Sequence, residues 1–376
     1  EAEIEDVPPQ WDTPGWLDEM FEAQGFSPEV IVHGANTLTE MMAHDDNIKL
    51  TTTDLTIHKR SKPFAQGAMR VASYAQVAFS TDHYVAKSFK KNGKVLAHLA
   101  EDMRCQTLSK AFALEFNALV DKEHAFEFLV TTCLEGRSET SEVEYLSLEL
   151  HIPGDFVKYN GNNGMVRKKM PRDGLNKAAQ AFSHFTFERS MGQLLVCDLQ
   201  GFGNMLTDPA IHTLDPKRFS LAATNLNMKG FKRFFASHKC NAICEKLELQ
   251  STREMLTNDT LRFRTSWPTL HNTMCCSNKL CGMAISTITS RELAEFPGYH
   301  WCDKCWPQLT SSKVDRICVA PGRHHEFNVS TFFCESQGKA LPRKCSKHHK
   351  KAAKISTTPV VSRGLWFRLK AATKNR

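Results

Sequence analysis

The sequence predicts a mixed α+β fold, and three patterns support this prediction. The segments 67–80 (GAMRVASYAQVAFS) and 83–90 (HYVAKSFK) have the composition of two strands joined by a short turn. Residues 94–120 then carry apolar side chains at helical spacing. Strand-like segments return at 126–134 and 144–152. We therefore expect strands and helices to alternate along this part of the chain.

The following segments continue the mixed pattern. We predict a helix at 175–185, the start of a strand at 184–190 and a short central strand at 193–199. A helix at 229–249, broken near Ser237, closes this region. After residue 252 the chain becomes rich in Cys, Thr and Ser without clear periodicity, and we place a domain boundary there.

Charge is spread unevenly along the chain. Residues 1–48, which include WDTPGWLDEMFEAQGF, hold twelve Asp or Glu and no Lys or Arg, and we predict an acidic arm with one short amphipathic helix. Residues 340–376 hold eleven Lys or Arg and no Asp or Glu, so the net charge of +7 belongs to this tail. The tail is either a disordered, solvated end or a contact for nucleic acid, anionic lipid or an acidic partner. The predicted domains are 1–48, 49–252, 253–339 and 340–376.

Composition favours a protein inside the cell. No apolar run approaches the length that crosses a bilayer, and no signal-peptide pattern is present. Thirteen cysteines, five of them between Cys275 and Cys305, indicate metal ligation more than disulfides in such a protein. We expect a cytoplasmic protein, with the basic tail as an alternative nuclear address. Because the chain starts at Glu1 rather than Met, we also expect a piece of a longer protein.

Lys87, at the end of the strand HYVAK, is the first candidate site residue. Glu115 on the predicted helix is a candidate partner, because a buried carboxylate needs a cation. Protein kinases hold nucleotide phosphates with such a strand lysine and helix glutamate. Alternatively, both residues are exposed surface charges. Main-chain groups of Glu149 and His151, where a strand passes into a linker, are candidates to contact an adenine edge.

Three polar side chains follow the apolar run LLV in the stretch CDLQGFGNMLTDPAIHT. Asp198, Gln200 and Asp208 offer two carboxylates and an amide, which suit Mg²⁺ together with water and phosphates. Asp198 can instead accept a proton from a hydroxyl nucleophile. Asp208 before Pro209 is also an ordinary helix N-cap with proline at the first helical position. Both interpretations stay open at this level.

Cys and His residues form two candidate zinc sites. In SHKCNAIC, His238, Cys240 and Cys244 lie close together and suit tetrahedral zinc, with His184 as a fourth ligand. These cysteines can instead be small buried hydrophobes. The candidate ligands of a second site are Cys276, Cys281, Cys302 and Cys305. Alternative ligands for that site are Cys318, Cys334, Cys345 and the pair His324–His325, and metal analysis is predicted to find two zinc atoms per chain.

Taken together, these motifs resemble one protein family. In order and spacing, they are similar to the motifs of the alpha-kinase family of atypical serine/threonine protein kinases. The motifs are GAMR, YVAK, HIPGDFVKYN, AFSHFTFE, LLVCDLQG, LTDPAIH and HKCNAIC, the last followed by LEL. The resemblance spans about residues 50–252. It implies a bilobal kinase-like fold with a mostly β N-lobe, a mixed, zinc-stabilised C-lobe and ATP between them.

The resemblance also implies roles for individual residues. Asp198 would orient the substrate hydroxyl, and Lys87 and Arg70 would contact phosphates. Gln200 and Asp208 would hold Mg²⁺. The zinc ligands would be His184, His238, Cys240 and Cys244. The other nucleotide-site candidates are Glu115, Glu149, His151, Lys158, Asn225 and Gly230.

One position departs from the family pattern. Asn227, in ATNLNMKGF, stands where a glycine is expected, while Gly230 remains. Asn is the least costly substitute for Gly if that position needs a positive φ. The leading hypothesis is an ATP- and Mg²⁺-dependent kinase that phosphorylates Ser or Thr of a protein substrate. The alternatives are a kinase-fold binding module without turnover and a nucleic-acid-binding protein built on the Cys-rich region and the basic tail.

Overall fold

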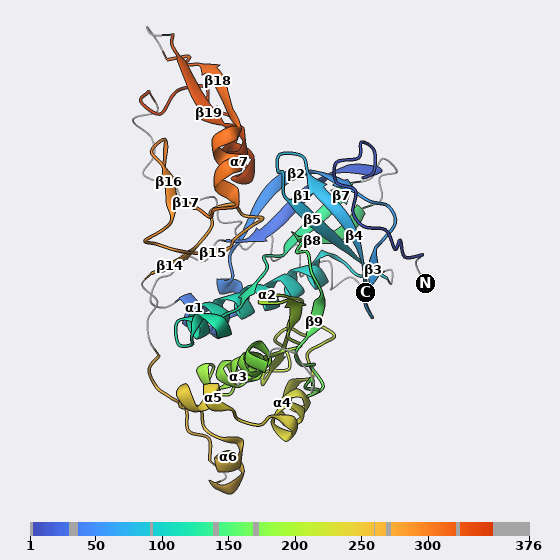
Figure 1. Cartoon of the computed structure of the whole chain (residues 1–376), viewed down its shortest axis with the longest axis vertical. Coiled ribbons are helices and arrows are strands. Elements are labelled where there is room, and N and C mark those ends of the chain that lie inside the picture. Colours follow the sequence, from blue (N-terminus) through green and yellow to red (C-terminus); the bar gives the residue numbers. More distant parts are fainter. Residues whose placement is uncertain are drawn as a thin grey trace.

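The computed structural model describes residues 3–29, 37–90, 93–137, 143–167, 173–258, 260–267, 272–320 and 324–348. Figure 1 shows a β-rich N-lobe, a C-lobe below it that holds most of the helices, and a C-terminal Cys-rich extension beside the N-lobe. The predicted basic tail beyond His348 lies outside the described residues. In the part of the chain that is described, no helix combines the length and apolar character needed to cross a membrane.

A seven-stranded antiparallel sheet forms the N-lobe. Its strands lie in the order β2-β1-β7-β8-β5-β4-β3, and β2 also pairs with β4, so the sheet curls back on itself. The strands are β1 (Glu19–Pro28), β2 (Leu50–Lys59), β3 (Ala65–Gln66), β4 (Arg70–Val77), β5 (His83–Phe89), β7 (Thr132–Arg137) and β8 (Val143–Leu150). The strands predicted around 67–90 and 144–152 are confirmed.

Strand β1 lies within the predicted acidic arm, and the short helix predicted for residues 1–48 is present as α1 (Thr37–Ala43). Strand β1 pairs with β2 over ten residue pairs and with β7 over five, so it lies inside the sheet. Gly25 allows close packing within the sheet, because a Cβ there would lie 2.8 Å from Leu55 Cδ1. Residues 19–28 therefore belong to the N-lobe sheet rather than to a separate acidic arm. The divisions predicted at 252 and 339 stay predictions.

Helix α2 (Leu96–Asn117) lies under the sheet and confirms the predicted long helix. Most of its side chains are buried. The C-lobe contains a four-stranded sheet in the order β6-β12-β11-β9 and the pair β10–β13. These strands are β6 (Glu127–Phe128), β9 (Phe156–Lys158), β10 (Leu194–Cys197), β11 (Gln200–Phe202), β12 (Met205–Thr207) and β13 (Ala210–Thr213). The predicted central strand at 193–199 is thus confirmed as β10.

The C-lobe helices confirm one prediction and correct another. They are α3 (Asp173–Arg189), α4 (Asn227–Ser237), α5 (Ala242–Lys246) and α6 (Thr252–Asn258), with α1 (Thr37–Ala43) beside α2. The predicted helix break at Ser237 is confirmed. The strand predicted to start at His184 is wrong, because α3 continues to Arg189. Phe185 completes a buried helical face with Ala178, Ala181 and Phe182.

The Cys-rich extension is folded and packs on the N-lobe sheet. It contains the hairpins β14 (Thr273–Cys275)–β15 (Ala284–Ser286), β16 (Arg291–Leu293)–β17 (Phe296–Trp301) and β18 (Lys313–Ile317)–β19 (Glu326–Ser330), and the helices α7 (Cys305–Ser311) and α8 (Thr331–Ser336). Trp301 and Phe332 share one apolar cluster with Tyr84 of β5 and Leu148 of β8. The Gln308 side chain accepts the Thr81 N–H at 2.9 Å, which fastens α7 to the turn before β5.

Candidate active site

The N-lobe sheet separates charged from apolar side chains. Successive residues of a strand point to opposite faces. On β5 and β8, Ala86 and Leu148 face the apolar cluster shared with the extension. Lys87, Ser147 and Glu149 therefore lie on the opposite face, and Lys87 lies across from Ser147 in the strand pairing. One face of the sheet thus carries the candidate site and the other carries the extension.

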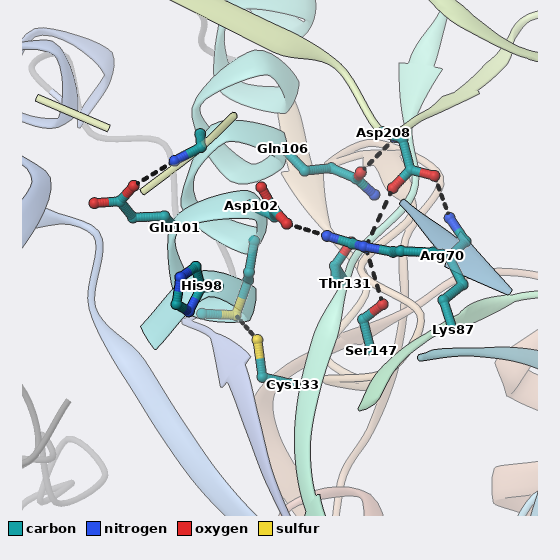
Figure 2. Close-up of polar contacts among 12 residues, drawn as sticks. Arg70, Lys87, His98, Glu101, Asp102, Gln106, Thr131, Cys133, Ser147 and Asp208 are labelled. Atoms are coloured by element: carbon teal, nitrogen blue, oxygen red, sulfur yellow. Dashed lines mark hydrogen bonds and ion pairs between the residues drawn. The ribbon is translucent and has the colours of Figure 1, made fainter. Parts of the chain in front are cut away.

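Lys87 makes three polar contacts, and Figure 2 shows the one with Asp208. Its Nζ donates to Asp208 Oδ2 at 2.6 Å, to Glu149 Oε2 at 2.8 Å and to Thr207 Oγ1 at 3.3 Å. The Lys87 side chain is only 12% exposed and that of Glu149 only 2%. Burial opposes the charge on Lys87, but the carboxylates of Asp208 and Glu149 raise its pKa above the ordinary value. Lys87 is therefore held as a cation.

Glu149, not Glu115, is the partner of Lys87, so the predicted pair with Glu115 is wrong. The Glu115 carboxylate instead accepts from Arg189 Nε at 2.7 Å and so joins α2 to α3. The Glu149 carboxylate also accepts from Thr131 Oγ1 at 2.6 Å and from Thr207 Oγ1 at 2.5 Å. Each oxygen of the buried Glu149 carboxylate therefore has a hydrogen-bond donor.

An adenine contact by the Glu149 and His151 main chain stays a prediction. The His151 N–H already donates to the His83 carbonyl at 2.9 Å, as an extension of the β5–β8 pairing. Residues 151–155 then lead from β8 to β9, from the N-lobe sheet to the C-lobe sheet. The two residues thus lie where the chain passes between the lobes, as the sequence predicts for a linker.

Arg70 adds a second cation beside Lys87. Figure 2 shows its guanidinium reaching from Asp102 on α2 toward Asp208 and Ser147. The guanidinium forms an ion pair with the Asp102 carboxylate. It also donates to Ser147 Oγ at 3.3 Å and lies 3.7 Å from Asp208 Oδ1. Burial acts to raise the pKa of Asp208, but Lys87 and Arg70 together lower it below the ordinary value. Asp208 is therefore an ionised carboxylate between two cations.

The sequence analysis missed Asp102 and Gln106, which lie one turn apart on α2. The Gln106 side chain accepts the Asp208 N–H at 2.9 Å, and its Nε2 donates to Glu149 Oε1 at 3.3 Å. Gln106 thus ties the C-lobe aspartate to the N-lobe glutamate. Asp102 and Gln106 are polar residues four positions apart on a helix that is otherwise almost wholly buried. This spacing is the signal that could have identified the two residues.

Asp198 and Lys158 form the second part of the site. Lys158 Nζ lies 2.6 Å from Asp198 Oδ1, and Lys158 pairs with Gln200 across β9 and β11. The Gln200 amide donates to the Asp208 carbonyl at 3.2 Å and lies 3.4 Å from Asp198 Oδ2. The amide therefore lies between the two aspartates, and the three polar residues of the stretch CDLQGFGNMLTDP come together as predicted.

Both aspartates have strained backbones. Asp198 has φ 58° and Asp208 has φ 50°, in the left-handed region that non-glycine residues rarely adopt. Such strain is maintained only where the surrounding structure imposes it, and it is common at functional sites. The interpretation of Asp208 as a helix N-cap is wrong, because Pro209 leads into the strand β13.

The segment ATNLNMKGF begins helix α4. Asn227 has φ 49°, so this position does adopt the positive φ that the expected glycine would take. Asn225 Oδ1 accepts the Asn227 N–H at 2.9 Å, and Asn225 Nδ2 donates to Thr213 Oγ1 at 2.9 Å. The Asn225 side chain thus fastens this turn to β13, and a nucleotide contact by it stays a prediction.

Gly230 lies inside α4, in agreement with the helix predicted to start at residue 229, and a nucleotide contact by Gly230 stays a prediction. A Cβ at Gly230 would lie 2.2 Å from His212 Cδ2. The His212 ring is itself fixed, because Nδ1 accepts the Leu226 N–H at 3.1 Å and Nε2 lies 2.9 Å from the Asn162 carbonyl. Gly230 therefore allows α4 to pack directly on this histidine.

Gly230→Ala is expected to destabilise the protein by about 1–3 kcal/mol, because α4 or His212 must shift. The helix preference of Ala over Gly acts in the opposite direction by about 1 kcal/mol, so a net loss isolates the steric clash. Urea unfolding measures the difference. Gly67→Ala is the control, since its Cβ would approach no atom closer than 4.0 Å. Equal stability of the two variants would contradict this packing role.

The first predicted zinc cluster is assembled from three helices. Cys240 Sγ lies 3.8 Å from His184 Nδ1 and 3.7 Å from His238 Nε2, and Cys244 Sγ lies 3.8 Å from His238 Nε2. Bond lengths at tetrahedral zinc imply nitrogen–sulfur separations of roughly 3.5 Å. Glu188 Oε1 lies 3.4 Å from His184 Nε2, the usual arrangement of a carboxylate behind a ligating histidine. The donor set therefore fits zinc.

The comparisons with known proteins agree with this geometry. Residues 65–244 match the model of the alpha-kinase family. Over these residues the chain is similar to alpha-kinase domains. Over 204 residues it is 38% identical to myosin heavy chain kinase B of Dictyostelium discoideum, covering 54% of this chain and 27% of that protein. It is 36% identical to human eukaryotic elongation factor 2 kinase over 205 residues, covering 52% and 27%. The chain thus spans about a quarter of the length of these relatives.

Solved structures extend the likeness to the fold. An alpha kinase from Entamoeba histolytica superposes with a TM-score of 0.53 at 27% identity, covering 66% of this chain and 98% of that one. The alpha-kinase domain of myosin heavy chain kinase A in complex with ADP gives 0.51 at 27% identity, covering 61% and 97%. The bilobal kinase-like fold of the alpha-kinase domain is therefore confirmed.

The second predicted cysteine cluster lies outside the family match, in the extension. Its four ligand atoms lie within 4.8 Å of one another, and Cys281 Sγ is 3.8 Å from Cys302 Sγ, as expected at tetrahedral zinc, where sulfurs are about 3.8 Å apart. The members are Cys276, Cys281, Cys302 and Cys305, all buried. The proposed alternative ligands are not part of this cluster: Cys318, His325 and Cys345 lie in a third group, and Cys334 and His324 belong to none of the groups found in the described residues.

Proposed function

We propose that this alpha-kinase domain is active and transfers the terminal phosphate of ATP to a Ser or Thr of a protein, with Mg²⁺. The observation that carries the proposal is the cation pair Lys87 and Arg70 on either side of the ionised Asp208, with Asp198 held nearby by Lys158. The two relatives compared above are protein kinases, and the solved alpha-kinase domain of myosin heavy chain kinase A is a complex with ADP.

The first group of residues suits a nucleotide and its metal. Phosphoryl transfer depends on positioning and on neutralising phosphate charge. Lys87 and Arg70 would supply that neutralisation, since both are held as cations on the same face of the sheet. The Asp208 carboxylate and the Gln200 amide oxygen are the hard donors that Mg²⁺ prefers, and Mg²⁺ would neutralise charge on the phosphate oxygens.

The second group suits the substrate hydroxyl. Asp198 would accept a hydrogen bond from the Ser or Thr hydroxyl and orient it toward the phosphate. The Lys158 ammonium at 2.6 Å and the strained backbone both restrict where that carboxylate can point. Orientation, rather than covalent chemistry, is the contribution expected from this residue.

A structural zinc in the C-lobe belongs to the same proposal. His184 on α3, His238 after α4, and Cys240 and Cys244 at α5 would hold it, so that one ion joins three helices. Binding free energy at such a site adds directly to folding free energy. The relevant support is the complete burial of His184 and the carboxylate of Glu188 behind it.

Asp198→Ala is expected to reduce phosphate incorporation from labelled ATP into a generic basic protein by at least about 100-fold. The assay uses the full chain with Mg²⁺. Asp54→Ala is the matched control, because Asp54 is an exposed carboxylate on β2. Equal labelling by wild type and Asp198→Ala, or none by any of the proteins, would overturn the proposal.

The structure also bears on the alternative of a binding module without turnover. That hypothesis rests on Asn227 in place of glycine. Since Asn227 keeps the positive φ of 49° and is bonded by Asn225, the backbone path of the loop does not require glycine there. We therefore favour the active enzyme.

A further inference from the structure

We propose that the extension contains a third zinc site, separate from the two predicted from the sequence. Its ligands are Cys318, His325, Cys345 and His348, whose ligand atoms all lie within 4.8 Å of one another. None of the four belongs to the His184 group or to the Cys276 group. The chain would thus hold three zinc ions instead of two.

The distances match a tetrahedral ion. His348 Nδ1 lies 3.3 Å from Cys318 Sγ and 3.4 Å from Cys345 Sγ, and His325 Nε2 lies 3.2 Å from Cys345 Sγ. Zinc bonds of about 2.3 Å to sulfur and 2.0–2.1 Å to nitrogen place ligand atoms roughly 3.5 Å apart. A single Cys–His contact could be a hydrogen bond, but here two thiols and two imidazoles converge on one point. Such a closed set of soft donors is characteristic of zinc.

Two short backbone structures present the ligands. Cys318 directly follows β18 and His325 directly precedes β19, and the Cys318 N–H donates to the His325 carbonyl at 2.9 Å. Cys345 and His348 belong to one tight turn, in which the His348 N–H donates to the Cys345 carbonyl at 3.0 Å. A hairpin and a C-x-x-H turn, each with two ligands, are a common way to build a zinc site.

An N–H group supports one of the sulfur ligands. The Cys345 N–H points at Cys318 Sγ, 3.4 Å away, and the Val319 N–H donates to the Arg343 carbonyl at 3.0 Å. An amide donor at a sulfur stabilises the thiolate form that binds metal. The same contacts bring the turn of Cys345 against the end of the hairpin, so the site is organised by the backbone as well as by the side chains.

The apolar core beside the four ligands is small. The apolar cluster here consists of Cys318, Ala320 and Cys345, with Phe327 packed against it. All five residues of β18 are exposed. Small units of this kind depend on metal ligation or disulfides for stability. The zinc would take the place of a hydrophobic core and fasten residues 343–348 to the hairpin.

Native mass spectrometry and elemental analysis of the intact chain test the site. Three zinc atoms per wild-type chain are expected, and two in the double variant Cys345→Ser/His348→Ala. Cys334→Ser is the control and should keep three, because Cys334 is a buried cysteine of the same extension outside all three groups. Two zinc atoms in the wild type, or no loss in the double variant, would overturn the site.

Thiol alkylation provides a measurement that needs no variant. In the zinc-loaded chain, Cys318 and Cys345 should react with iodoacetamide at least about tenfold more slowly than after chelation, as mapped by peptide mass spectrometry. Equal rates before and after chelation would contradict the proposal. Neither result depends on kinase activity, so failure here is distinct from failure of the proposed function.

Discussion

Replacing Lys87 with Met is expected to abolish phosphate transfer and to lower the free energy of unfolding by about 3–5 kcal/mol. The stability loss arises because Glu149, with 2% exposure, would keep its burial but lose its cation. The activity loss arises because, within the described residues, Lys87 is one of only two cationic side chains that form an ion pair with Asp208. Chemical denaturation and the labelled-ATP assay measure the two effects separately.

A double variant separates stability from activity. In Lys87→Met/Glu149→Gln the buried charge is gone from both partners, so part of the lost stability should return while activity stays absent. Lys246→Met is the matched control, because its ion pair with Asp121 is exposed on both sides and should be worth less than about 1 kcal/mol. If Lys87→Met were as stable as this control, Glu149 would not depend on Lys87.

Deleting residues 272–376 is expected to leave the rest of the chain insoluble or partly unfolded. The extension covers the apolar face of the N-lobe sheet, where residues such as Ile57, Tyr84 and Leu148 are almost completely buried. Each such side chain gains about 1.5–3 kcal/mol from burial, so exposing several approaches the whole 5–15 kcal/mol stability of a typical domain.

The control for this deletion is the removal of residues 349–376 alone, which leaves every described residue in place. Its melting temperature and soluble yield should equal those of the full chain. A soluble 1–271 chain that melts within a few degrees of the full chain would contradict the role given to the extension. The family match over 65–244 would then correspond to an independent folding unit, which the shared apolar cluster argues against.

Local patterns predicted much of the fold and part of the site. The periodicity of α2, the strands around Lys87 and the grouping of Asp198 with Asp208 follow from short stretches of sequence. Glu149 could not be identified as the partner of Lys87 in this way. That pairing depends on which strand lies beside β5, and only the topology of the sheet determines it.

The third cysteine group shows a different limit. Its ligands come in two pairs, with Cys345 twenty positions after His325, and the predicted boundary at residue 339 divides them. From the sequence, Cys345 is only an alternative ligand of the Cys276 site, and His348, among the lysines of the basic tail, is not a candidate. Charge composition thus concealed a ligand spacing, since solvated lysines and metal ligands can alternate along one short turn.

The central position of β1 also has a consequence for synthesis of the protein. β1 can pair with β2 as soon as both strands have left the ribosome. Its other edge stays unpaired until β7 has been synthesised, about a hundred residues after β1. At 5–20 residues per second this interval lasts roughly 5–20 s. During it the nascent chain presents an open strand edge that can accept a foreign strand. The strand order itself thus sets how long this edge stays unpaired during synthesis.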